Sequence, residues 1–595
     1  MREFSVPTLV DLPDSATLTD APFTRARENP GQIMFRRKSG GTWSSVTAAE
    51  FRDEVVRVAK GLIAAGFGPG DRIALMSRTR YEWTLLDYAI WTVGGVTVPI
   101  YETSSAEQVE WIIGDSGAKA TFAETAEHEA TIASVQDKLP ALTQVWGIEA
   151  GALDTLAEQG AEVTDETVDE HRGTRQAIDT ATLVYTSGTT GRPKGCELTH
   201  GNLVSTARNA IQGALAEVTV VGSSTLLFLP LAHVFARLIQ VACVEAGLIL
   251  GHSDIRSLLP DLESYQPTFL LAVPRVFEKV YNGAEQKAAA AGKGKIFHAA
   301  ADTAIAYSTS LDTGGPGLAL KLKHKLFDIL VYGKLRAAVG GQVSYAVAGG
   351  AALGERLGHF FRGVGIVILE GYGLTETTAP ATVNRPDAIK IGTVGKPIPG
   401  VTVRIAEDGE ILVRGINVFK GYWHNEAASK EALDEGWFHT GDIGSLDSEG
   451  YLKITGRKKE ILVTAGGKNV APAPLEDRIR ANPLISQCLV VGDGKPFIAC
   501  LITLDPEALE PWKKAHGKPE GMTIAELSKD PEIIAEIDSA VANANKSVSK
   551  AESVKKYHIL DVDFTEGSGY LTPSLKIRRH VVVKDFSAEI EALYS

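Results

Sequence analysis

The chain has 595 residues, and its 60 Lys and Arg residues against 73 Asp and Glu residues give a formal net charge of −13. Hydrophobic residues make up 44% and charged residues 22%, which excludes a disordered, collagen-like or fibrous chain. The length predicts several domains or subdomains, and the acidic balance argues against a nucleic-acid-binding protein while leaving room for a local anion site.

The cysteine content and the hydropathy pattern bear on location. The four cysteines form no C-x-x-C pair, so we expect a reduced, cytoplasmic protein without disulfides or a thiolate zinc site. Met1–Asp20 lacks the basic start and apolar core of a secretory signal. The most apolar long stretch, Leu238–Leu250, contains Gln240 and Glu245 and is shorter than the ~20 residues of a membrane span, so no transmembrane segment is expected.

Alternating patterns in the first third of the chain indicate an α/β fold. Residues 50–180 alternate amphipathic stretches with short apolar runs, which is typical of layered α/β structure. Phe51–Ala65 is a predicted helix and Arg72–Met76 a predicted strand. The polar stretch Asp165–Thr174 is predicted to be a surface loop, and Ala181–Tyr185 to be a buried strand.

A glycine-rich segment directly follows this buried strand. Tyr185–Gly195 reads Tyr-Thr-Ser-Gly-Thr-Thr-Gly-Arg-Pro-Lys-Gly. Glycines let backbone N–H groups approach an anion, hydroxyls add donors, and Lys194 adds a positive charge, so the segment predicts a phosphate-binding loop. Its spacing is not that of a P-loop, and the chain contains no G-x-G-x-x-G. An ordinary glycine-rich turn is the alternative.

A basic region follows in the middle of the chain. From Lys279 to Arg336 it is rich in Ala and Lys, with nine Lys and Arg residues against four acidic ones. Helices with a basic face are predicted here. Two alternatives stay open for that face: peripheral contact with an anionic membrane surface, or an ordinary solvated helix surface.

The pattern of the chain changes near residue 457. Short β-type segments such as Val401–Ile405 precede the basic run Arg457–Lys459. A Pro-started helix, Pro474–Ala481, and further strands follow it. We therefore predict an N-terminal domain over residues 1–456 and a C-terminal domain over residues 457–595.

Several segments together resemble one enzyme superfamily. Residues 185–195 resemble the phosphate-loop motif of the adenylate-forming superfamily, which includes acyl-CoA synthetases, the adenylation domains of peptide synthetases, and beetle luciferases. Other family motifs follow in family order: Leu229–Arg237, Gly349–Ala352, Gly371–Thr377, His439–Asp442, Gly456–Glu460 and Thr572–Lys576. Val273–Lys279, Phe419–Ala427 and Gly466–Pro472 look most like segments of long-chain fatty-acid-CoA ligases. The resemblance implies an α/β fold with a large N-terminal domain of layered α/β subdomains and a small, mobile α+β C-terminal domain.

By this resemblance, most motif residues surround ATP. The β- and γ-phosphates would contact Thr186, Ser187, Gly188, Thr189, Thr190, Gly191 and Lys194. The adenine and α-phosphate would lie against Gly349, Gly350, Gly371, Tyr372, Gly373 and Thr375, and Glu376 would hold Mg²⁺. Asp442 would accept hydrogen bonds from the ribose hydroxyls, and Arg457 would bind a phosphate or ribose oxygen. Taken singly, Glu376 as a surface residue, Asp442 as a turn cap and Arg457 as a solvated charge are ordinary roles.

The catalytic assignments also follow from the resemblance. Lys576 would reach in from the C-terminal domain to bridge the carboxylate and the α-phosphate, acting with Thr186, Glu376 and His233. The family usually has Gly before this lysine, whereas this chain has Leu575. His233 would lie beside the bound carboxylate and the thiol entrance, although a buried structural histidine is the alternative.

Domain movement is implied as well. In the family the hinge is the Asp or Lys two positions after the motif Arg, which is Lys459 in this sequence. Gly466 and Gly467 would line the tunnel for the pantetheine thiol, where a residue without Cβ leaves room.

The function implied is a two-step ligation. ATP, with Mg²⁺ as cofactor, and a long-chain fatty acid would give an acyl-adenylate and pyrophosphate; coenzyme A would then displace AMP and give acyl-CoA. The alternatives are a fatty-acyl-AMP ligase that delivers the acyl group to a carrier protein, a luciferase-like oxygenation, and a non-catalytic nucleotide- or lipid-binding module. The joint presence of Glu376, Asp442, Arg457 and Lys576 argues against the last.

Overall fold

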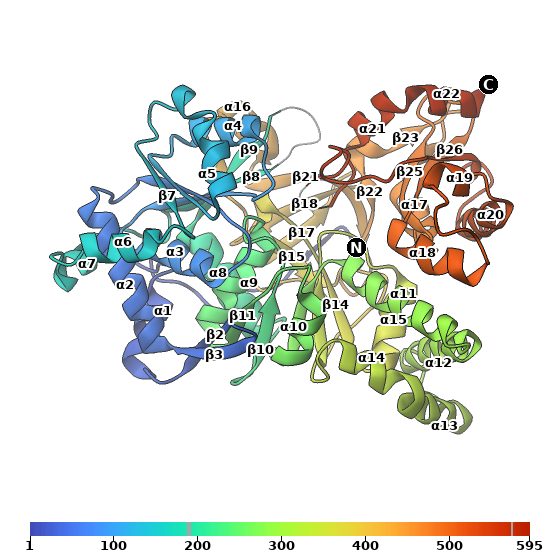
Figure 1. Cartoon of the computed structure of the whole chain (residues 1–595), viewed down its shortest axis with the longest axis horizontal. Coiled ribbons are helices and arrows are strands. Elements are labelled where there is room, and N and C mark those ends of the chain that lie inside the picture. The colour runs from blue at the N-terminus through green and yellow to red at the C-terminus, as the bar shows by residue number, and fades with distance from the viewer. Residues whose placement is uncertain (187–191, 573–574) are drawn as a thin grey trace.

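The computed structural model describes residues 1–186, 192–572 and 575–595. Figure 1 shows a large N-terminal part, blue to yellow, and a smaller C-terminal part, orange to red. No helix within the described residues has the length and apolar composition of a membrane span.

A seven-stranded sheet organises the first part of the chain. Its strand order is β19-β9-β8-β5-β4-β6-β7. The strands are β4 (Arg72–Met76), β5 (Val96–Ile100), β6 (Ala120–Ala123), β7 (Gln144–Gly147), β8 (Thr180–Thr186), β9 (Lys194–Thr199) and β19 (Gly421–Tyr422). Strands β4 to β8 pair in parallel, and β9 and β19 are antiparallel additions at one edge. Because the parallel strands are covered on both faces, they read as nearly continuous apolar runs.

The helices around this sheet follow the sequence pattern with one exception. The predicted helix over Phe51–Ala65 is confirmed as α2 (Ala48–Ala64), which begins with a capping box formed by Thr47 and Glu50. The prediction of a loop over Asp165–Thr174 is wrong, because Asp165–Arg172 forms helix α7. Thr164 caps this helix by accepting from the Thr167 N–H at 3.2 Å, and its acidic first turn and basic last turn both complement the helix dipole. Polarity alone therefore concealed a helix.

Two further sheets complete the middle of the chain. A five-stranded sheet has the order β12-β13-β14-β15-β16, and a four-stranded sheet has the order β10-β11-β2-β3. The former comprises β12 (Phe269–Ala272), β13 (Tyr345–Ala348), β14 (Val367–Leu374), β15 (Ala379–Val383) and β16 (Lys396–Pro397). The latter comprises β2 (Ile33–Ser39), β3 (Thr42–Thr47), β10 (Ser224–Leu227) and β11 (Ile249–His252). The neighbouring helices include α3 (Tyr81–Thr92), α8 (His200–Gln212), α9 (Val234–Ala246), α10 (Leu258–Tyr265) and α15 (Glu355–Val364).

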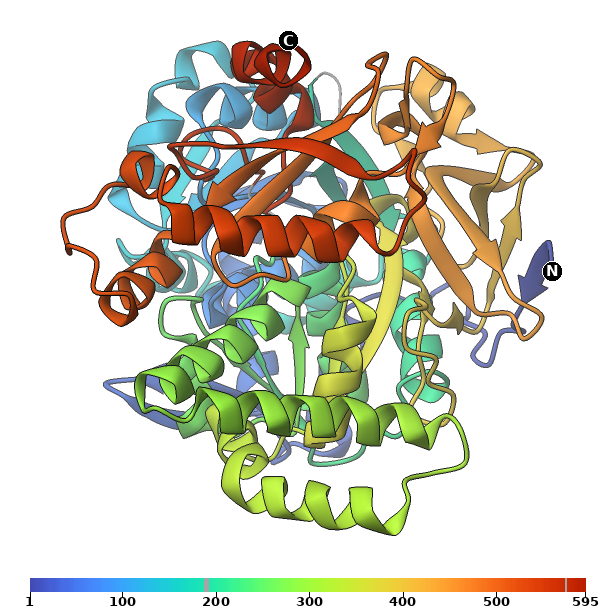
Figure 2. The ribbon, with the colours of Figure 1, turned by 90° about the vertical axis from the view of Figure 1, so that its right-hand side faces the viewer.

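The region predicted to form basic helices is helical. It comprises α11 (Pro274–Ala290), α12 (Gly294–Leu311), α13 (Leu318–Phe327), a π-helical segment at Asp328–Tyr332 and α14 (Gly333–Ala338). Helices α12 and α13 form the lower edge of the molecule in Figures 1 and 2.

A six-stranded antiparallel sheet precedes the C-terminal part. It comprises β1 (Glu3–Ser5), β17 (Val401–Ile405), β18 (Glu410–Gly415), β20 (Leu433–Asp434), β21 (Trp437–Leu446) and β22 (Leu452–Arg457). The β21–β22 register places Asp442 directly opposite Arg457. Two motifs that lie fifteen positions apart in the sequence thus meet on one ladder.

The C-terminal part has its own core. Its sheet, β25 (Ile485–Val491), β26 (Ile498–Leu504) and β27 (Val554–Ile559), is apolar on both faces. Alternate residues of β25 belong to two different clusters, Cys488 and Val490 to one and Leu489 and Val491 to the other. Helices α17 (Ala473–Ile479) and α20 (Pro531–Asn545) cover the first face, and α21 (Arg579–Asp585) and α22 (Ser587–Tyr594) cover the second. Figure 2 shows α20 on the outer side of this small domain.

Candidate active site

The ends of the glycine-rich segment are held by paired strands. Thr186 is the last residue of β8 and Lys194 the first of β9, and the two are direct partners in the antiparallel ladder. The predicted phosphate ligands Ser187, Gly188, Thr189, Thr190 and Gly191 lie outside the described residues. The Lys194 ammonium lies 4.9 Å from the ring centroid of Tyr422.

Tyr422 connects this lysine to the predicted metal ligand. Its hydroxyl donates a hydrogen bond of 2.8 Å to Oε1 of Glu376, which lies in a 3₁₀ turn after β14. Burial, followed by the charge of Glu376, raises the pKa of Tyr422, so its hydroxyl stays a donor. Tyr422 is not among the predicted site residues. Its position within Phe419–Ala427, a segment that resembles long-chain fatty-acid-CoA ligases, was the feature of the sequence that pointed to it.

The surroundings of Glu376 suit a magnesium ion held mainly by phosphates. The described residues contain no group of three or more His, Cys, Asp or Glu side chains that could hold a metal alone. Glu376 is half-buried, and only its Oε1 atom accepts from Tyr422. Mg²⁺ typically takes one or two carboxylates together with substrate phosphates and water, so this donor set fits it.

Asp442 is an ordered, buried carboxylate. The residue is 4% exposed; its Oδ2 accepts from the Tyr372 hydroxyl at 2.7 Å and its Oδ1 from Arg457 Nε at 2.9 Å. Burial and the neighbouring Asp442 charge raise the pKa of Tyr372 well above its usual value. Each carboxylate oxygen has a second acceptor site, so Asp442 can still accept from two vicinal hydroxyls.

The predicted glycines divide into two groups. A Cβ on Gly373 would come within 1.5 Å of the Ala379 carbonyl oxygen, and one on Gly371 within 3.1 Å of the Thr382 oxygen. Gly373 is therefore required by the close approach of β15, and a side chain at Gly371 would lie tightly against the same strand. Gly349 and Gly350 are different: their nearest neighbours are side chains, and Gly350 has φ +85°, which favours glycine.

His233 caps helix α9. Its Nδ1 accepts from the backbone N–H of Phe235 at 3.2 Å, which leaves Nε2 as the protonated nitrogen. Burial, and then the positive charge of Lys576, lower the pKa of His233 to about 4, so the ring is neutral at pH 7. This histidine therefore has a structural role and also lies within the electrostatic reach of Lys576.

Arg237 has a structural role four residues later. It is 1% exposed and pairs with the fully buried Asp87 of α3 through Nε at 2.9 Å and also through Nη2. Its guanidinium lies 5.3 and 5.2 Å from the ring centroids of Trp83 and Trp91. Because unpairing a buried charge is costly, this contact holds α9 against α3.

Lys576 comes from the C-terminal part and faces the residues just described. Desolvation of its ammonium group by the surrounding protein lowers the pKa of Lys576, and the charge of Arg457 lowers it further. The residue as a whole remains exposed. The charges of Asp442 and Glu376 act in the opposite direction. The structure thus brings Lys576 together with Asp442, Arg457 and Glu376.

The turn before Lys576 explains the unusual residue in this motif. Leu575 has φ +60°, in the left-handed region that favours glycine. An L-residue with a Cβ pays about 1 to 2 kcal/mol for this conformation. The Thr572 N–H donates to the Lys576 carbonyl at 2.8 Å. The left-handed backbone is the physical reason why glycine suits this position.

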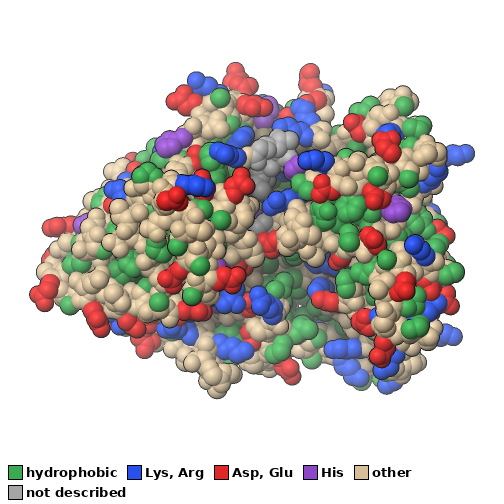
Figure 3. Space-filling view, turned by 45° about the horizontal axis from the view of Figure 1, so that its top comes forward, with side chains coloured by type: hydrophobic (Ala, Val, Ile, Leu, Met, Phe, Trp, Pro, Cys, Tyr) green, Lys and Arg blue, Asp and Glu red, His purple; other side chains and the backbone are tan. Residues whose placement is uncertain are grey.

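Polar contacts fix the small domain in this orientation. Arg275 at the start of α11 donates through Nη2 to Asp505 of the C-terminal part at 2.9 Å, and Lys279 pairs with Glu507 at 3.0 Å. On another side, Thr103 donates to Glu566. Figure 3 shows the surface hollowed between the two parts, with Lys and Arg side chains on both sides.

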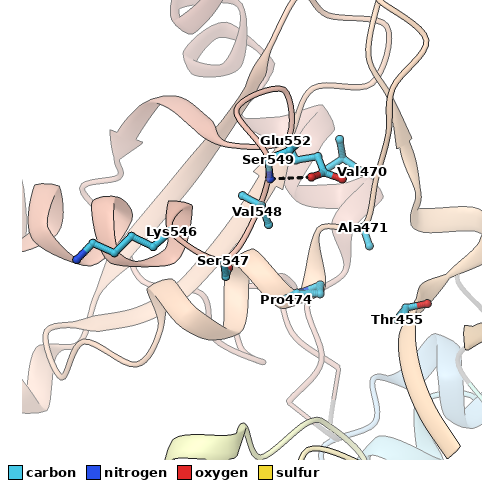
Figure 4. Close-up of a pocket in the computed structure, with 9 residues that line it drawn as sticks. All are labelled: Thr455, Val470, Ala471, Pro474, Lys546, Ser547, Val548, Ser549 and Glu552. Atoms are coloured by element: carbon cyan, nitrogen blue, oxygen red, sulfur yellow. Dashed lines mark hydrogen bonds between the residues drawn. The ribbon is translucent and has the colours of Figure 1, made fainter. Parts of the chain in front are cut away.

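The predicted hinge lies where the two parts join. Lys459 is exposed and belongs to a 3₁₀ turn directly after β22, whereas Lys458 pairs with Glu410 at 3.1 Å. Beside this turn a cavity of about 420 Å³ separates Thr455 of β22 from Ala471 and other residues of the small domain (Figure 4). A Cβ placed on Gly456 of β22 would lie 3.2 Å from the Ala471 Cβ, so β22 still approaches the small domain closely beside this cavity.

The two glycines predicted to line the thiol tunnel are exposed to solvent. Gly466 and Gly467 form an exposed turn between β23 (Leu462–Val463) and β24 (Asn469–Val470). Gly467 has φ +77°, and no atom lies within 4 Å of a Cβ placed on it. The role of this turn in thiol passage stays a prediction.

Comparison with known proteins agrees with this geometry. A family model described as AMP-binding enzyme matches residues 23–423. The chain belongs to this family. The C-terminal domain of AMP-binding enzymes matches residues 459–595. The resemblance to adenylate-forming enzymes and the predicted α/β fold are thus confirmed.

Individual AMP-binding enzymes are similar over their whole length. Long-chain-fatty-acid–CoA ligase FadD15 of Mycobacterium bovis is 53% identical over 602 residues, covering 100% of both chains. The crystal structure of the anthranilate CoA ligase AuaEII in complex with anthranoyl-AMP superposes with a TM-score of 0.72 at 19% identity, covering 98% of this chain and 99% of that one. O-succinylbenzoate coenzyme A synthetase from Bacillus subtilis, in complex with ATP and magnesium, has a TM-score of 0.68 at 21% identity, with coverage of 94% and 98%. The two structures support the fold alone.

Proposed function

We propose that the protein is an AMP-forming long-chain fatty-acid–CoA ligase. The full-length similarity to the long-chain-fatty-acid–CoA ligase FadD15 supports the substrate class. The observation that carries the chemistry is the placement of Lys576, from the small domain, within the electrostatic reach of Asp442, Arg457 and Glu376 of the large one. A protein that only binds a nucleotide has no need of a lysine presented across a domain boundary.

In the first step the fatty-acid carboxylate attacks the α-phosphate of ATP. Thr186 and Lys194 would bind the β- and γ-phosphates, Thr375 the α-phosphate, and Asp442 the ribose hydroxyls. Tyr372 and Arg457 orient the Asp442 carboxylate through the two hydrogen bonds that they donate to it. Lys576 would stabilise the negative charge that develops between carboxylate and α-phosphate.

Glu376 would hold Mg²⁺, which, when bound, neutralises charge on the phosphates. Tyr422 orients the Glu376 carboxylate by donating to Oε1 and places the aromatic ring beside the Lys194 ammonium. His233, neutral at pH 7, would border the acyl carboxylate without adding a positive charge that competes with Lys576.

In the second step the coenzyme A thiol attacks the acyl carbonyl and AMP leaves. We propose that the domains are residues 1–456 and 457–595, and that the small domain rotates about Lys459 between the two steps. The rotation would withdraw Lys576 and bring the Gly466–Gly467 turn to the thiol path. The ion pairs of Arg275 with Asp505 and of Lys279 with Glu507 would break in this rotation, and each such partly exposed pair contributes up to about 1 kcal/mol.

The substrates and the cysteines also bear on location. All four cysteines of the chain are free and buried. Together with the need for ATP and coenzyme A, this supports a cytoplasmic location.

A coenzyme-A-dependent assay of AMP release tests the function directly. We expect turnover with long-chain fatty acids, loss of turnover on chelation of Mg²⁺, and a thioester product with free coenzyme A. Formation of acyl-AMP without any thioester would instead support a fatty-acyl-AMP ligase that delivers to a carrier protein. Absence of acyl-AMP with every acid would support a binding module and contradict the proposal.

The ion pair between Arg275 and Asp505 should matter for adenylation and not for thioester formation. Arg275→Ala should lower the rate of adenylation about two- to fivefold, because a partly exposed ion pair contributes up to about 1 kcal/mol to the docked orientation. The rate of thioester formation from supplied acyl-adenylate should not fall. Lys279→Ala, which removes the more exposed pair with Glu507, is the matched control and should have a smaller effect. Equal slowing of both half-reactions by Arg275→Ala would contradict this interpretation.

A further inference from the structure

An unpartnered apolar face lies on the outer side of α13 and the π-helical segment after it. Leu318, Leu322 and Leu326 follow each other at intervals of four and are 81%, 70% and 54% exposed. Ile329 and Leu330 continue the face at 73% and 49% exposure. Residues four apart lie on one side of a helix, so these five side chains form a continuous stripe, which we call the outer leucine face.

The opposite side of the same segment is already packed, so the outer leucine face is not part of the core. Phe327 and Tyr332 are buried in the main core. His324 Nε2 donates to the Gly363 carbonyl at 2.6 Å, and its ring stacks on Tyr307 with 3.9 Å between ring centroids. The helix is therefore anchored by one face and presents a second apolar face outward.

Lysines border the outer leucine face. Lys321, Lys323 and Lys325 alternate with the leucines of α13, and all three are exposed. The acidic residue of the segment, Asp328, is paired with Arg336 at 2.7 Å. A chain with a net charge of −13 thus carries a basic, apolar surface at this place.

The position of α13 leaves this surface accessible. The helix lies at the lower edge of the molecule in Figures 1 and 2, beyond α12 and away from the small C-terminal domain. A planar partner could therefore approach α13 without obstructing the domain movement.

We propose that the outer leucine face binds the surface of an anionic phospholipid membrane. A helix with exposed leucines flanked by exposed lysines matches an interfacial amphipathic helix. Its apolar side chains would enter the acyl boundary, and its ammonium groups would pair with lipid phosphates. The charge decides between this partner and others, because an overall acidic protein is repelled by an anionic surface except where a basic face is turned toward it. The proposal goes beyond the ligase activity and does not depend on it.

Vesicle flotation tests the proposal. The probes are vesicles of phosphatidylcholine alone and vesicles with about one third phosphatidylglycerol, each mixed with the full chain. The wild-type protein should float with the anionic vesicles and lose binding as salt rises. Leu322→Ser combined with Ile329→Ser should weaken binding about tenfold or more, and Lys321→Gln with Lys323→Gln and Lys325→Gln should remove the preference for phosphatidylglycerol.

Matched controls separate membrane binding from folding and from catalysis. Ile178→Ser combined with Val583→Ser removes two exposed apolar side chains elsewhere, which are 71% and 43% exposed, and should leave flotation unchanged. AMP release with detergent-dispersed fatty acid should be unchanged in all variants.

Three results would overturn the proposal. The first is wild-type protein that stays unbound, and the second is equal flotation of wild type and the Leu322/Ile329 variant. The third is a dimer in sedimentation velocity, without vesicles, that the same variant dissociates, since a second copy would then cover the face.

Discussion

Replacement of Lys576 by alanine should lower the rate of adenylation from free fatty acid about 10²- to 10³-fold, the usual loss on removing a donor that stabilises developing charge. The charges of Arg457, Asp442 and Glu376 all act on the Lys576 ammonium group in the orientation that the structure shows, so we assign its contribution to the first half-reaction. Thioester formation from supplied acyl-adenylate should remain within about twofold of wild type.

The two half-reactions are measured separately, as pyrophosphate release and as acyl-CoA formation from acyl-adenylate. Lys584→Ala, an exposed lysine on α21, is the matched control and should change neither rate. An equal loss in both assays for Lys576→Ala would show that the lysine acts through the fold of its domain.

Replacement of Lys459 by proline should slow thioester formation and leave adenylation nearly unchanged. Proline fixes φ near −65° and also restricts the preceding residue, so a turn that must change its backbone angles can no longer do so. The structure shows the orientation with Lys576 in place, and we expect this orientation to be kept. Acyl-CoA formation should fall by about two orders of magnitude or more, while pyrophosphate release on the first turnover stays near the wild-type value.

Lys459→Ala is the control for the hinge, because it removes the same side chain and leaves the backbone free. Both half-reactions of that variant should stay close to wild type. If Lys459→Pro slows both half-reactions together, the hinge lies at another residue.

The sequence by itself determined the chemistry of the site to a large extent. Glu376, Asp442, Arg457 and Lys576 were assigned from short motifs, because each motif keeps a reactive side chain next to residues that fix the local backbone. The structure then brings these four together from β14, β21, β22 and the C-terminal domain. Apolar periodicity likewise predicted a helix over Phe51–Ala65 and a strand over Ala181–Tyr185, which the structure has at Ala48–Ala64 and Thr180–Thr186.

Tertiary structure decided what depends on distant partners. Tyr422 joins Lys194 to Glu376 only because β19 pairs with β9, and Gly373 is required only because β15 passes against it. The helix Asp165–Arg172 was not predicted because its sequence is almost entirely polar. It is stabilised by the Thr164 cap and by the burial of Val168 alone among its side chains.

The basic region shows the same division most clearly. Its composition predicted helices and left open whether their surface meets lipid or water. Periodicity cannot tell an inward apolar face from an outward one, because both have the same spacing. Only packing decides: Phe327 and Tyr332 are buried in the core, whereas Leu318, Leu322 and Ile329 face solvent.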